Sequence, residues 1–302
     1  MVDVVFLSSL LAASLRLAVP VVITAEGEAI AERSGVMNIG IEGIALLGAF
    51  AATVVTSITR NPGLGVLAAL LIGALAGAIH AVISMNPRGN QILSGIGLNT
   101  FALGFTAYGM IIVWGELFAS SSPPVPKIPK IPLPITGAFN ELSIFVVLMF
   151  ILAGIIYFLI FKTRLGLHLR SAGENPAAAD AAGLNVYRIR FLAVVIGASL
   201  AALSGAYLVV DQQGRFLRFM ATRGFTALAI VVFGNWNPFI ILIGGLIFGF
   251  GEALVSRLAP ALGVGLAPQF VQMVPLILTI AIYSLRRKTV QPEALGEPFV
   301  KE

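Results

Sequence analysis

The ionisable side chains of this chain are few, and their types and spacing limit the chemistry it can carry out. Among 302 residues there are 14 acids, two histidines and no cysteine. His80 and His168 lie far apart in the sequence, so a histidine-based metal site is not expected. The sequence also lacks a G-x-x-x-x-G-K-[ST] phosphate loop, and no Ser-His-Asp or two-carboxylate arrangement stands out. We therefore expect no metal site, no catalytic residues, no resident cofactor and no ATPase site in this chain.

One polar stretch, Lys162 to Arg190, combines basic charge with helix-terminating signals around a short alanine-rich run. Asn175 is a good N-cap residue, and Pro176 suits the first helical position. Gly183 can adopt the left-handed conformation that closes a helix C-terminus. The pattern predicts a helix of about seven residues, which is too short to be stable alone and must be held by its loop or dock on a surface. The alternative is an ordinary loop with one helical turn.

Other polar groups lie inside apolar runs, where they are costly and usually face a bundle interior or water. Asn99 lies well within such a run, and Phe101, Phe105 and Tyr108 follow it. These rings could stack on a planar solute, although simple packing is the commoner use of aromatic side chains. A residue near the end of a run can instead reach the interface, as Glu252 would beside Arg257. The candidates for a polar path are Asn38, Glu42, Gln91, Asn99, Glu252 and Gln272, together with Phe101 and Phe105.

The elements that must position these groups are membrane-spanning helices. The chain is 58% hydrophobic and 11% charged, whereas a soluble domain has about 25% charged residues. Apolar runs of about 20 residues recur and are continuous rather than alternating, which excludes a β-barrel. The net charge of +5 then reflects Lys and Arg in cytoplasmic loops, not nucleic-acid binding. We predict an all-α, polytopic integral membrane protein with a single domain over residues 1–302.

The apolar runs predict about 8–10 transmembrane helices. They include a short or re-entrant segment near residues 222–234 and two glycine pairs, Gly73 with Gly77 and Gly245 with Gly249, whose spacing predicts close helix contacts. The Pro-rich loop 116–140 should be extended, and the polar tail 286–302 should fray. The predicted full spans are residues 4–24, 42–59, 64–84, 91–115, 141–161, 191–210, 238–257 and 267–285.

Loop charge predicts the orientation in the membrane. The polar stretch 162–190 and the cluster 286–288 are the strongest basic segments and are placed in the cytoplasm. The C-terminus is then cytoplasmic, and with nine crossings the N-terminus and the Pro-rich loop lie outside. Arg215, Arg218 and Arg223 would then lie outside or in a cavity, so they count against this topology or indicate an anionic partner there.

Four stretches in order along the chain resemble one known family. AEGEAIAERSGVMNIGIEGIALLGAFAA (25–52) is similar to the N-terminal signature of permease subunits of ABC importers, in the branched-chain amino acid/ribose-type superfamily. Its form over residues 32–43 most resembles the nucleoside (simple sugar-like) permeases. NQILSGIGLN (90–99) resembles the entry of their fourth span, and RGFTALAIVVFGNWNPFIILIGGLIFG (223–249) resembles their late membrane segment. GENPAAADAAGLNV (173–186) resembles the cytoplasmic loop that contacts the ATPase.

The resemblance implies a permease subunit of a bacterial plasma (inner) membrane importer. Its partners would be a nucleotide-binding subunit that holds ATP-Mg, a second permease chain, usually a different homologue, and a solute-binding lipoprotein, besides membrane lipid. The helix 175–183 would be the coupling helix that docks on the ATPase. The ATPase-coupling residues would then be Gly173, Glu174, Asn175, Pro176, Ala179, Asp180 and Gly183.

Three alternatives stay open on the sequence. Within the family, the solute could be a nucleoside, a sugar of the ribose or galactose type, a branched-chain amino acid or a vitamin. A more remote reading is an ion-coupled secondary transporter that uses an intramembrane acid, Glu42 or Glu252. A membrane scaffold without transport is the third, but it would leave the polar residues within spans without a purpose.

Overall fold

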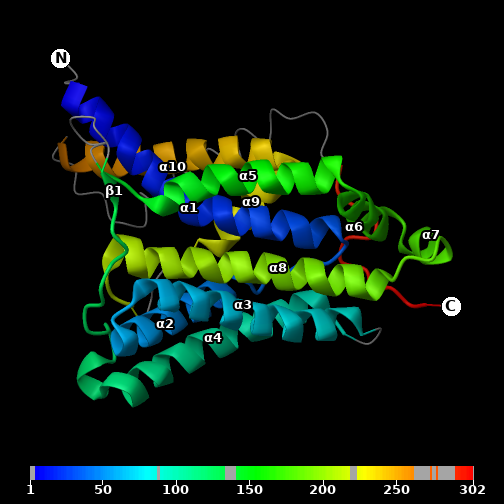
Figure 1. The fold of residues 1–302 in the computed structure, drawn as a ribbon, viewed down its shortest axis with the longest axis horizontal. Helices are drawn as coiled ribbons and strands as arrows, with labels where there is room; N and C mark the ends of the chain where they lie inside the picture. The colour runs from blue at the N-terminus through cyan, green and yellow to red at the C-terminus, as the bar shows by residue number, and fades with distance from the viewer. Residues whose placement is uncertain are drawn as a thin grey trace.

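The computed structural model describes residues 4–86, 89–132, 141–217, 223–261 and 290–301, and the single positions 273 and 277. Helices make up most of this part of the chain and run roughly parallel to one long axis (Figure 1). Apart from positions 273 and 277, the predicted last span 267–285, with Gln272, lies outside the described residues, as do the basic cluster 286–288 and Arg218.

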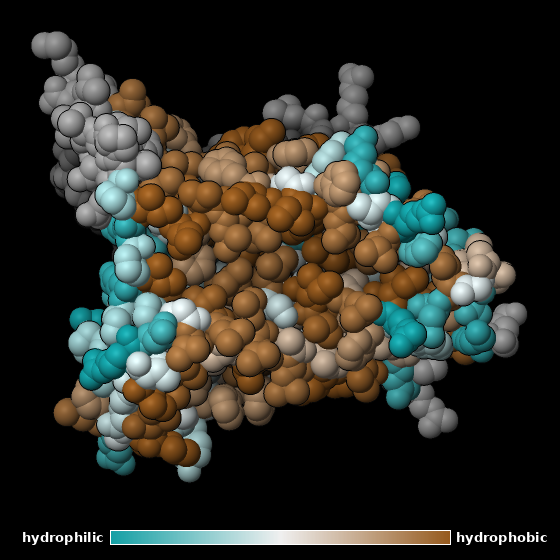
Figure 2. Space-filling view, viewed as in Figure 1, coloured by the Kyte–Doolittle hydropathy of each residue, from teal (hydrophilic) through white to brown (hydrophobic). Residues whose placement is uncertain are grey.

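Seven helices in the described part are long and apolar enough to cross a membrane, which confirms the all-α, polytopic prediction. A broad apolar belt covers the face seen in Figure 2, with polar side chains gathered at its two ends. This pattern is what a bilayer-spanning bundle requires. The seven helices are α1 (Val4–Arg33), α2 (Ile41–Thr59), α3 (Pro62–Met85), α4 (Gln91–Trp114), α5 (Ile144–Lys162), α8 (Val186–Tyr207) and α10 (Pro238–Ala261).

Shorter elements connect these spans. Helix α9 (Gly224–Gly234) has 11 residues, about 16 Å at 1.5 Å per residue, so it cannot cross a bilayer core of about 30 Å. The prediction of a short segment here is confirmed. The others are a 3₁₀ turn (Glu116–Phe118), α6 (Arg164–Glu174), α7 (Pro176–Ala181), a π-helical turn (Leu208–Gln213) that extends α8, and two short antiparallel strands, β1 (Ile131–Pro132) and β2 (Glu141–Leu142).

The first helix is longer than predicted. The expected end near residue 24 is wrong, because α1 continues to Arg33 and carries Glu26, Glu28 and Glu32 into the interior of the bundle. Glu28 accepts a hydrogen bond from the Asn38 amide beyond the end of the helix, and Glu32 accepts one from the Trp236 indole, 204 residues further along the chain. Such partners are invisible to a hydropathy argument, which counts every acid as a reason to end a span.

Close packing around α8 and α1 forms the core, as the glycine pairs predict. A Cβ on Gly73 would lie 2.5 Å from the Ala202 Cβ, and one on Gly77 would lie 2.5 Å from the Ala198 Cβ. Helices α3 and α8 therefore approach as closely as small residues permit. Gly245 and Gly249 bring α10 equally close to Val22 and to the backbone of Ser14 on α1. Both predictions of close helix contact are confirmed.

The Pro-rich loop begins with the 3₁₀ turn Glu116–Phe118, which was not predicted, and has no helix over the rest of its described part, residues 119–132. It runs beside the end of α8 and the π-helical turn, and three of its amides donate to backbone carbonyls there: Ser122 to Phe216, Val125 to Gly214 and Ile128 to Val210, at 2.8–2.9 Å. The loop and the α1 N-terminus lie at one end of the bundle, and α6, α7 and residues 290–301 lie at the other, the α7 end (Figure 1).

Candidate functional site

Helix α7 is closed at both ends by its own sequence. The Asn175 side-chain Oδ1 accepts from the Ala178 amide at 2.9 Å, and Pro176 takes the first helical position. At the other end Gly183 has φ +85°. The Gly183 amide donates to the Asp180 carbonyl at 2.8 Å and the Leu184 amide to the Ala179 carbonyl at 3.0 Å. This is the paired arrangement of a Schellman motif, so the predicted short capped helix is present.

The structure brings the seven predicted coupling residues together around α7. Gly173 is buried where α6 ends, and a Cβ there would lie 2.3 Å from the Arg33 carbonyl oxygen. Glu174 pairs with Arg33 at 3.8 Å. Ala179 is the buried residue of α7, and Asp180 pairs with Lys301 at 3.1 Å. The outer face of α7 presents only small side chains, Ala177, Ala178 and Ala181, and is exposed.

Two features of this end were not predicted. Helix α6 precedes α7 and is capped by Thr163, whose Oγ1 accepts from the Gly166 amide at 3.1 Å. A Thr two residues ahead of Leu-Gly was a usable capping signal. The expected frayed tail is wrong for residues 290–301, because this segment packs across the α7 end of the bundle. Its contacts are with residues distant in sequence, for which the tail itself carries no signal.

A second polar site lies where α1 gives way to α2. The connecting residues 34–40 are not helical, so their backbone groups need partners within the bundle. The Met37 amide donates to Gln91 Oε1 at 2.8 Å, and the Asn38 amide donates to Glu28 Oε1 at 2.8 Å. Asn38 Oδ1 in turn accepts from the Gly40 amide at 3.0 Å. Side chains of α1 and α4 thus replace the missing helical hydrogen bonds.

The start of α2 is held in the same way. Asn99 Oδ1 accepts from the Gly43 amide at 2.7 Å, and Asn99 Nδ2 donates to the Ile39 carbonyl at 3.0 Å. The Glu42 carboxylate accepts from the Gly224 amide at the first residue of α9. The structure therefore joins four predicted path candidates, Asn38, Glu42, Gln91 and Asn99, into one network around two helix N-termini inside the bundle. Their role in a solute path stays a prediction.

The other polar-path candidates lie elsewhere. Glu252 pairs with Arg223, so neither is a free charge. Phe101 and Phe105 stack on each other with centroids 5.4 Å apart. They are 58% and 48% exposed on the outer face of α4, where they line a shallow groove with Tyr108. The aromatic candidates are thus separate from the network around Asn99.

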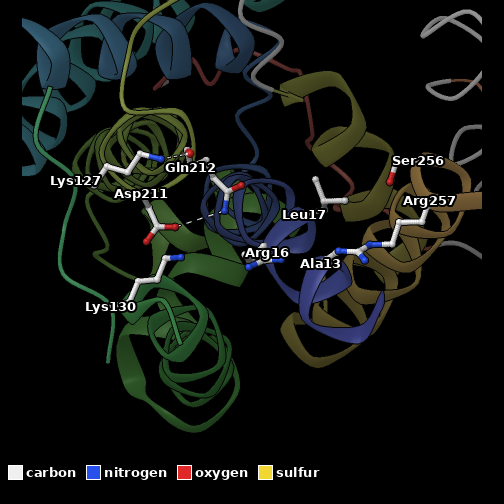
Figure 3. Close-up of a pocket in the computed structure, with 9 residues that line it drawn as sticks. All are labelled: Ala13, Arg16, Leu17, Lys127, Lys130, Asp211, Gln212, Ser256 and Arg257. Atoms are coloured by element: carbon white, nitrogen blue, oxygen red, sulfur yellow. Dashed lines mark hydrogen bonds between the residues drawn. The ribbon is translucent and has the colours of Figure 1, made fainter. Parts of the chain in front are cut away.

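A cavity of about 320 Å³ opens at the end opposite α7. Four basic residues line it, Arg16, Lys127, Lys130 and Arg257, against one acid, Asp211 (Figure 3). Lys127 Nζ donates to the Gln212 carbonyl at 2.6 Å, and Asp211 accepts from Ser143 at 2.7 Å. The cavity lining is therefore predominantly basic, with Arg215 exposed at the same end of the bundle.

A known family accounts for most of the chain. The family described as the permease component of the branched-chain amino acid transport system matches residues 10–283. The guanosine ABC transporter permease protein NupQ of Bacillus subtilis is 35% identical, over 98% of this chain and 97% of its own length. The nucleoside ABC transporter permease protein NupC of Lactococcus lactis is 34% identical over 93% of both chains.

A putative glucose ABC transporter permease protein, TsgC13 of Haloferax volcanii, is 30% identical over 98% of this chain and 99% of its own length. Bacillus subtilis and Lactococcus lactis each have a second permease protein that matches, at 25% and 24% identity. No solved structure matches the chain significantly.

Proposed function

The chain belongs to the family of permease components of branched-chain amino acid transport systems, and we propose that it is the permease subunit of an ATP-driven importer of nucleosides. The observation that carries this proposal is identity of 34–35% over nearly the full length with permeases of guanosine and nucleosides. The glucose relative at 30% identity makes a sugar the second candidate.

Helix α7 is the element through which ATP hydrolysis would act. It docks on a separate nucleotide-binding subunit that holds ATP-Mg, and this chain contributes no nucleotide site. Its capped ends fix a short rod, and its exposed alanines fit a shallow groove on a partner. Because α7 is bounded by α6 and α8, a push on it reaches the bundle directly.

The polar network around residues 34–43 is the part of the bundle best suited to respond. Two helix N-termini, those of α2 and α9, meet there at side chains rather than in continuous helices. Broken helices of this kind commonly mark solute sites in transporters, because freed backbone groups can bind polar solutes. Movement of α1 and α9 against α2 would open the path first to one side and then to the other.

The proposal also assigns the orientation in the membrane and the remaining partners. The α7 end and the C-terminus are cytoplasmic, the N-terminus is outside, and the membrane is a bacterial plasma membrane. A second permease, a different homologue, completes the path, as the paired permease proteins of two relatives' bacteria suggest. A solute-binding lipoprotein docks outside, where the basic cavity would receive its acidic side chains.

Uptake by the intact system tests the solute. Cells that express the chain with its neighbouring subunits should take up labelled guanosine, and unlabelled adenosine should compete while glucose and leucine should not. Competition by glucose alone would support the sugar candidate instead. An N-terminal tag should co-purify a nucleotide-binding subunit, and absence of that subunit would contradict the proposal.

Ion-coupled transport makes an opposite prediction. The purified chain alone in liposomes should then take up guanosine under a proton or sodium gradient. We expect no uptake, because the two acids considered for such coupling, Glu42 and Glu252, are both engaged: Glu42 caps α9 and Glu252 pairs with Arg223. Uptake by the chain alone that is lost in Glu42→Gln would establish the ion-coupled mechanism.

A further inference from the structure

Residues 290–301, the C-terminal strap, cross the α7 end of the bundle and contact three separate parts of it (Figure 1). The strap begins at the turn after α9, passes the end of α6 and then the loop that follows α1. Four of its amides donate in turn: Val290 to Asn235 Oδ1 at 2.9 Å, Glu293 to Glu174 Oε2 at 3.3 Å, Ala294 to the Gly173 carbonyl at 2.9 Å and Gly296 to the Gly35 carbonyl at 3.1 Å.

Phe299 anchors the far end of the strap under α7. Its ring is 7% exposed and lies in one apolar cluster with Ala172, Ala179 and Val186. It also packs against Tyr187, with ring centroids 5.4 Å apart, and the Tyr187 hydroxyl donates to the Phe299 carbonyl at 3.0 Å. Since Ala179 is the buried residue of α7, Phe299 forms part of the apolar surface against which α7 packs.

Arg190 ties the middle of the strap to the bundle. Its side chain is 1% exposed, an unusual place for an arginine. Nη1 donates to the Glu297 carbonyl at 2.8 Å and Nη2 to the Ala172 carbonyl at 3.2 Å. A Cβ on Gly35 would lie 2.6 Å from Nη2. One guanidinium therefore fills the crossing point of the strap, α6 and the loop after α1.

Without the strap, α7 would be connected to the bundle mainly through two non-helical backbone positions. The N-terminal position is Asn175, with φ −145° and ψ 88°, and the C-terminal position is Gly183, with φ +85°. Neither position is helical, so a push on α7 could be absorbed by rotation about them. The strap bonds α6 to the loop after α1 and to the turn after α9, and Phe299 holds α7 to α6 and α8. These contacts bridge both non-helical positions, so α7 cannot rotate about Asn175 or Gly183 without breaking contacts of the strap.

We propose that the C-terminal strap is a coupling element, in which Phe299 and Arg190 are positioning residues that hold α7 rigidly against α1 and α9. This inference rests on the proposed function. Displacement of α7 by the ATPase then moves the ends of α1 and α9, which lead to the network around residues 34–43. A second link joins these two helices at the same end, because the Trp236 indole donates to Glu32.

Hydrogen exchange on the detergent-purified permease tests the strap itself. In Phe299→Ala the peptide covering residues 174–185 should exchange about tenfold faster than in the wild type, because α7 loses the apolar contact of Ala179 with the Phe299 ring. Val300→Ala, one residue further on and 57% exposed, is the matched control and should leave the exchange unchanged. Equal exchange of this peptide in both variants and the wild type would overturn the proposal.

The coupling role is measured in the whole complex, purified by an N-terminal tag and reconstituted in liposomes with its binding protein. In Phe299→Ala the number of ATP molecules hydrolysed per guanosine taken up should rise about threefold or more. Phe299→Leu, which keeps an apolar side chain at the same packing position, should restore most of the coupling. An unchanged ratio in Phe299→Ala refutes the role even if its stability falls.

A second variant, Tyr187→Phe, covers the case in which Phe299→Ala does not fold. If Phe299→Ala does not reach the membrane, Tyr187→Phe removes one hydrogen bond to the strap and keeps the ring packing. It should raise both the exchange rate and the ATP-to-guanosine ratio by about twofold, and no change in either would reject the proposal. If the wild-type complex takes up no nucleoside, the proposed function fails, whereas the exchange comparison still decides whether the strap holds α7.

Discussion

At the residue scale, Glu26, Glu28 and Glu32 of α1 are all buried but differ in their hydrogen-bond partners. Glu28 accepts from the Asn38 amide, and Glu32 accepts from the Trp236 indole. Neither carboxylate oxygen of Glu26 makes a hydrogen bond with any described residue. A buried polar group without a partner is unfavourable, whereas a paired one stabilises a specific contact. The three acids should therefore respond differently to the same substitution.

We predict that Glu32→Leu lowers the thermal stability of the detergent-purified permease and that Glu26→Leu raises it. The first change leaves the Trp236 N–H buried and unpaired, at about 1–3 kcal/mol. The second removes a buried group that has no described partner. Size-exclusion chromatography after heating measures both midpoints. A fall in both midpoints would show that Glu26 also makes a stabilising interaction and would contradict the prediction.

At the scale of elements, helices at the two ends of the bundle begin at asparagine caps but depend on them to different degrees. Asn175 caps α7, and Asn61 caps α3 by accepting from the Gly63 and Leu64 amides. The cap matters most for α7, because six residues form too few internal hydrogen bonds to be stable. Helix α3 has 24 residues and packs closely on α8, so loss of its cap only frays one end.

Asn175→Ala should reduce nucleoside uptake at least fivefold while the amount of folded permease stays near the wild-type level. Loss of an N-cap costs about 0.5–2 kcal/mol, a large share of what holds α7. Asn61→Ala removes the same interaction at the opposite end and should leave uptake unchanged. Initial uptake rates, normalised to membrane protein, compare the two. Equal rates would mean that order in α7 is unimportant for transport.

At the scale of the whole molecule, basic residues gather at both ends rather than at one. The α7 end carries those of the coupling loop, Lys162 to Arg190, and the opposite end carries those around the basic cavity. The positive-inside rule alone therefore decides the orientation poorly in the described part of the chain. Under the proposed orientation the cavity faces outward, where docking of an acidic partner would favour such an excess of positive charge.

The double variant Lys127→Gln/Lys130→Gln should raise the binding-protein concentration that half-saturates ATPase stimulation by about threefold to tenfold, with little change in the maximal rate. Each rim charge pair is worth about 0.2–1 kcal/mol, and both lysines line the cavity. Arg60→Gln, an exposed charge in the turn between α2 and α3 at the same end, is the control. A similar rise in Arg60→Gln would indicate general charge steering instead of docking at the cavity.

The sequence by itself determined the features that depend on local signals. Apolar run length predicted the described spans and the short α9, and the glycine pairs predicted the contacts of α3 with α8 and of α10 with α1. Asn175, Pro176 and Gly183 located α7, because caps act on residues within four positions. These signals involve neighbouring atoms only, so no knowledge of the tertiary fold is needed to interpret them.

Only the tertiary structure decided where distant residues meet. It continued α1 through three acids, joined Asn38, Glu42, Gln91 and Asn99 into one network, and packed the C-terminal strap beneath α7 through Arg190 and Phe299. Most of these contacts join residues far apart in the sequence. The carboxylate of Glu32 and the polar groups of the tail have no preferred place until their partners satisfy their hydrogen bonds, and only the fold brings those partners close.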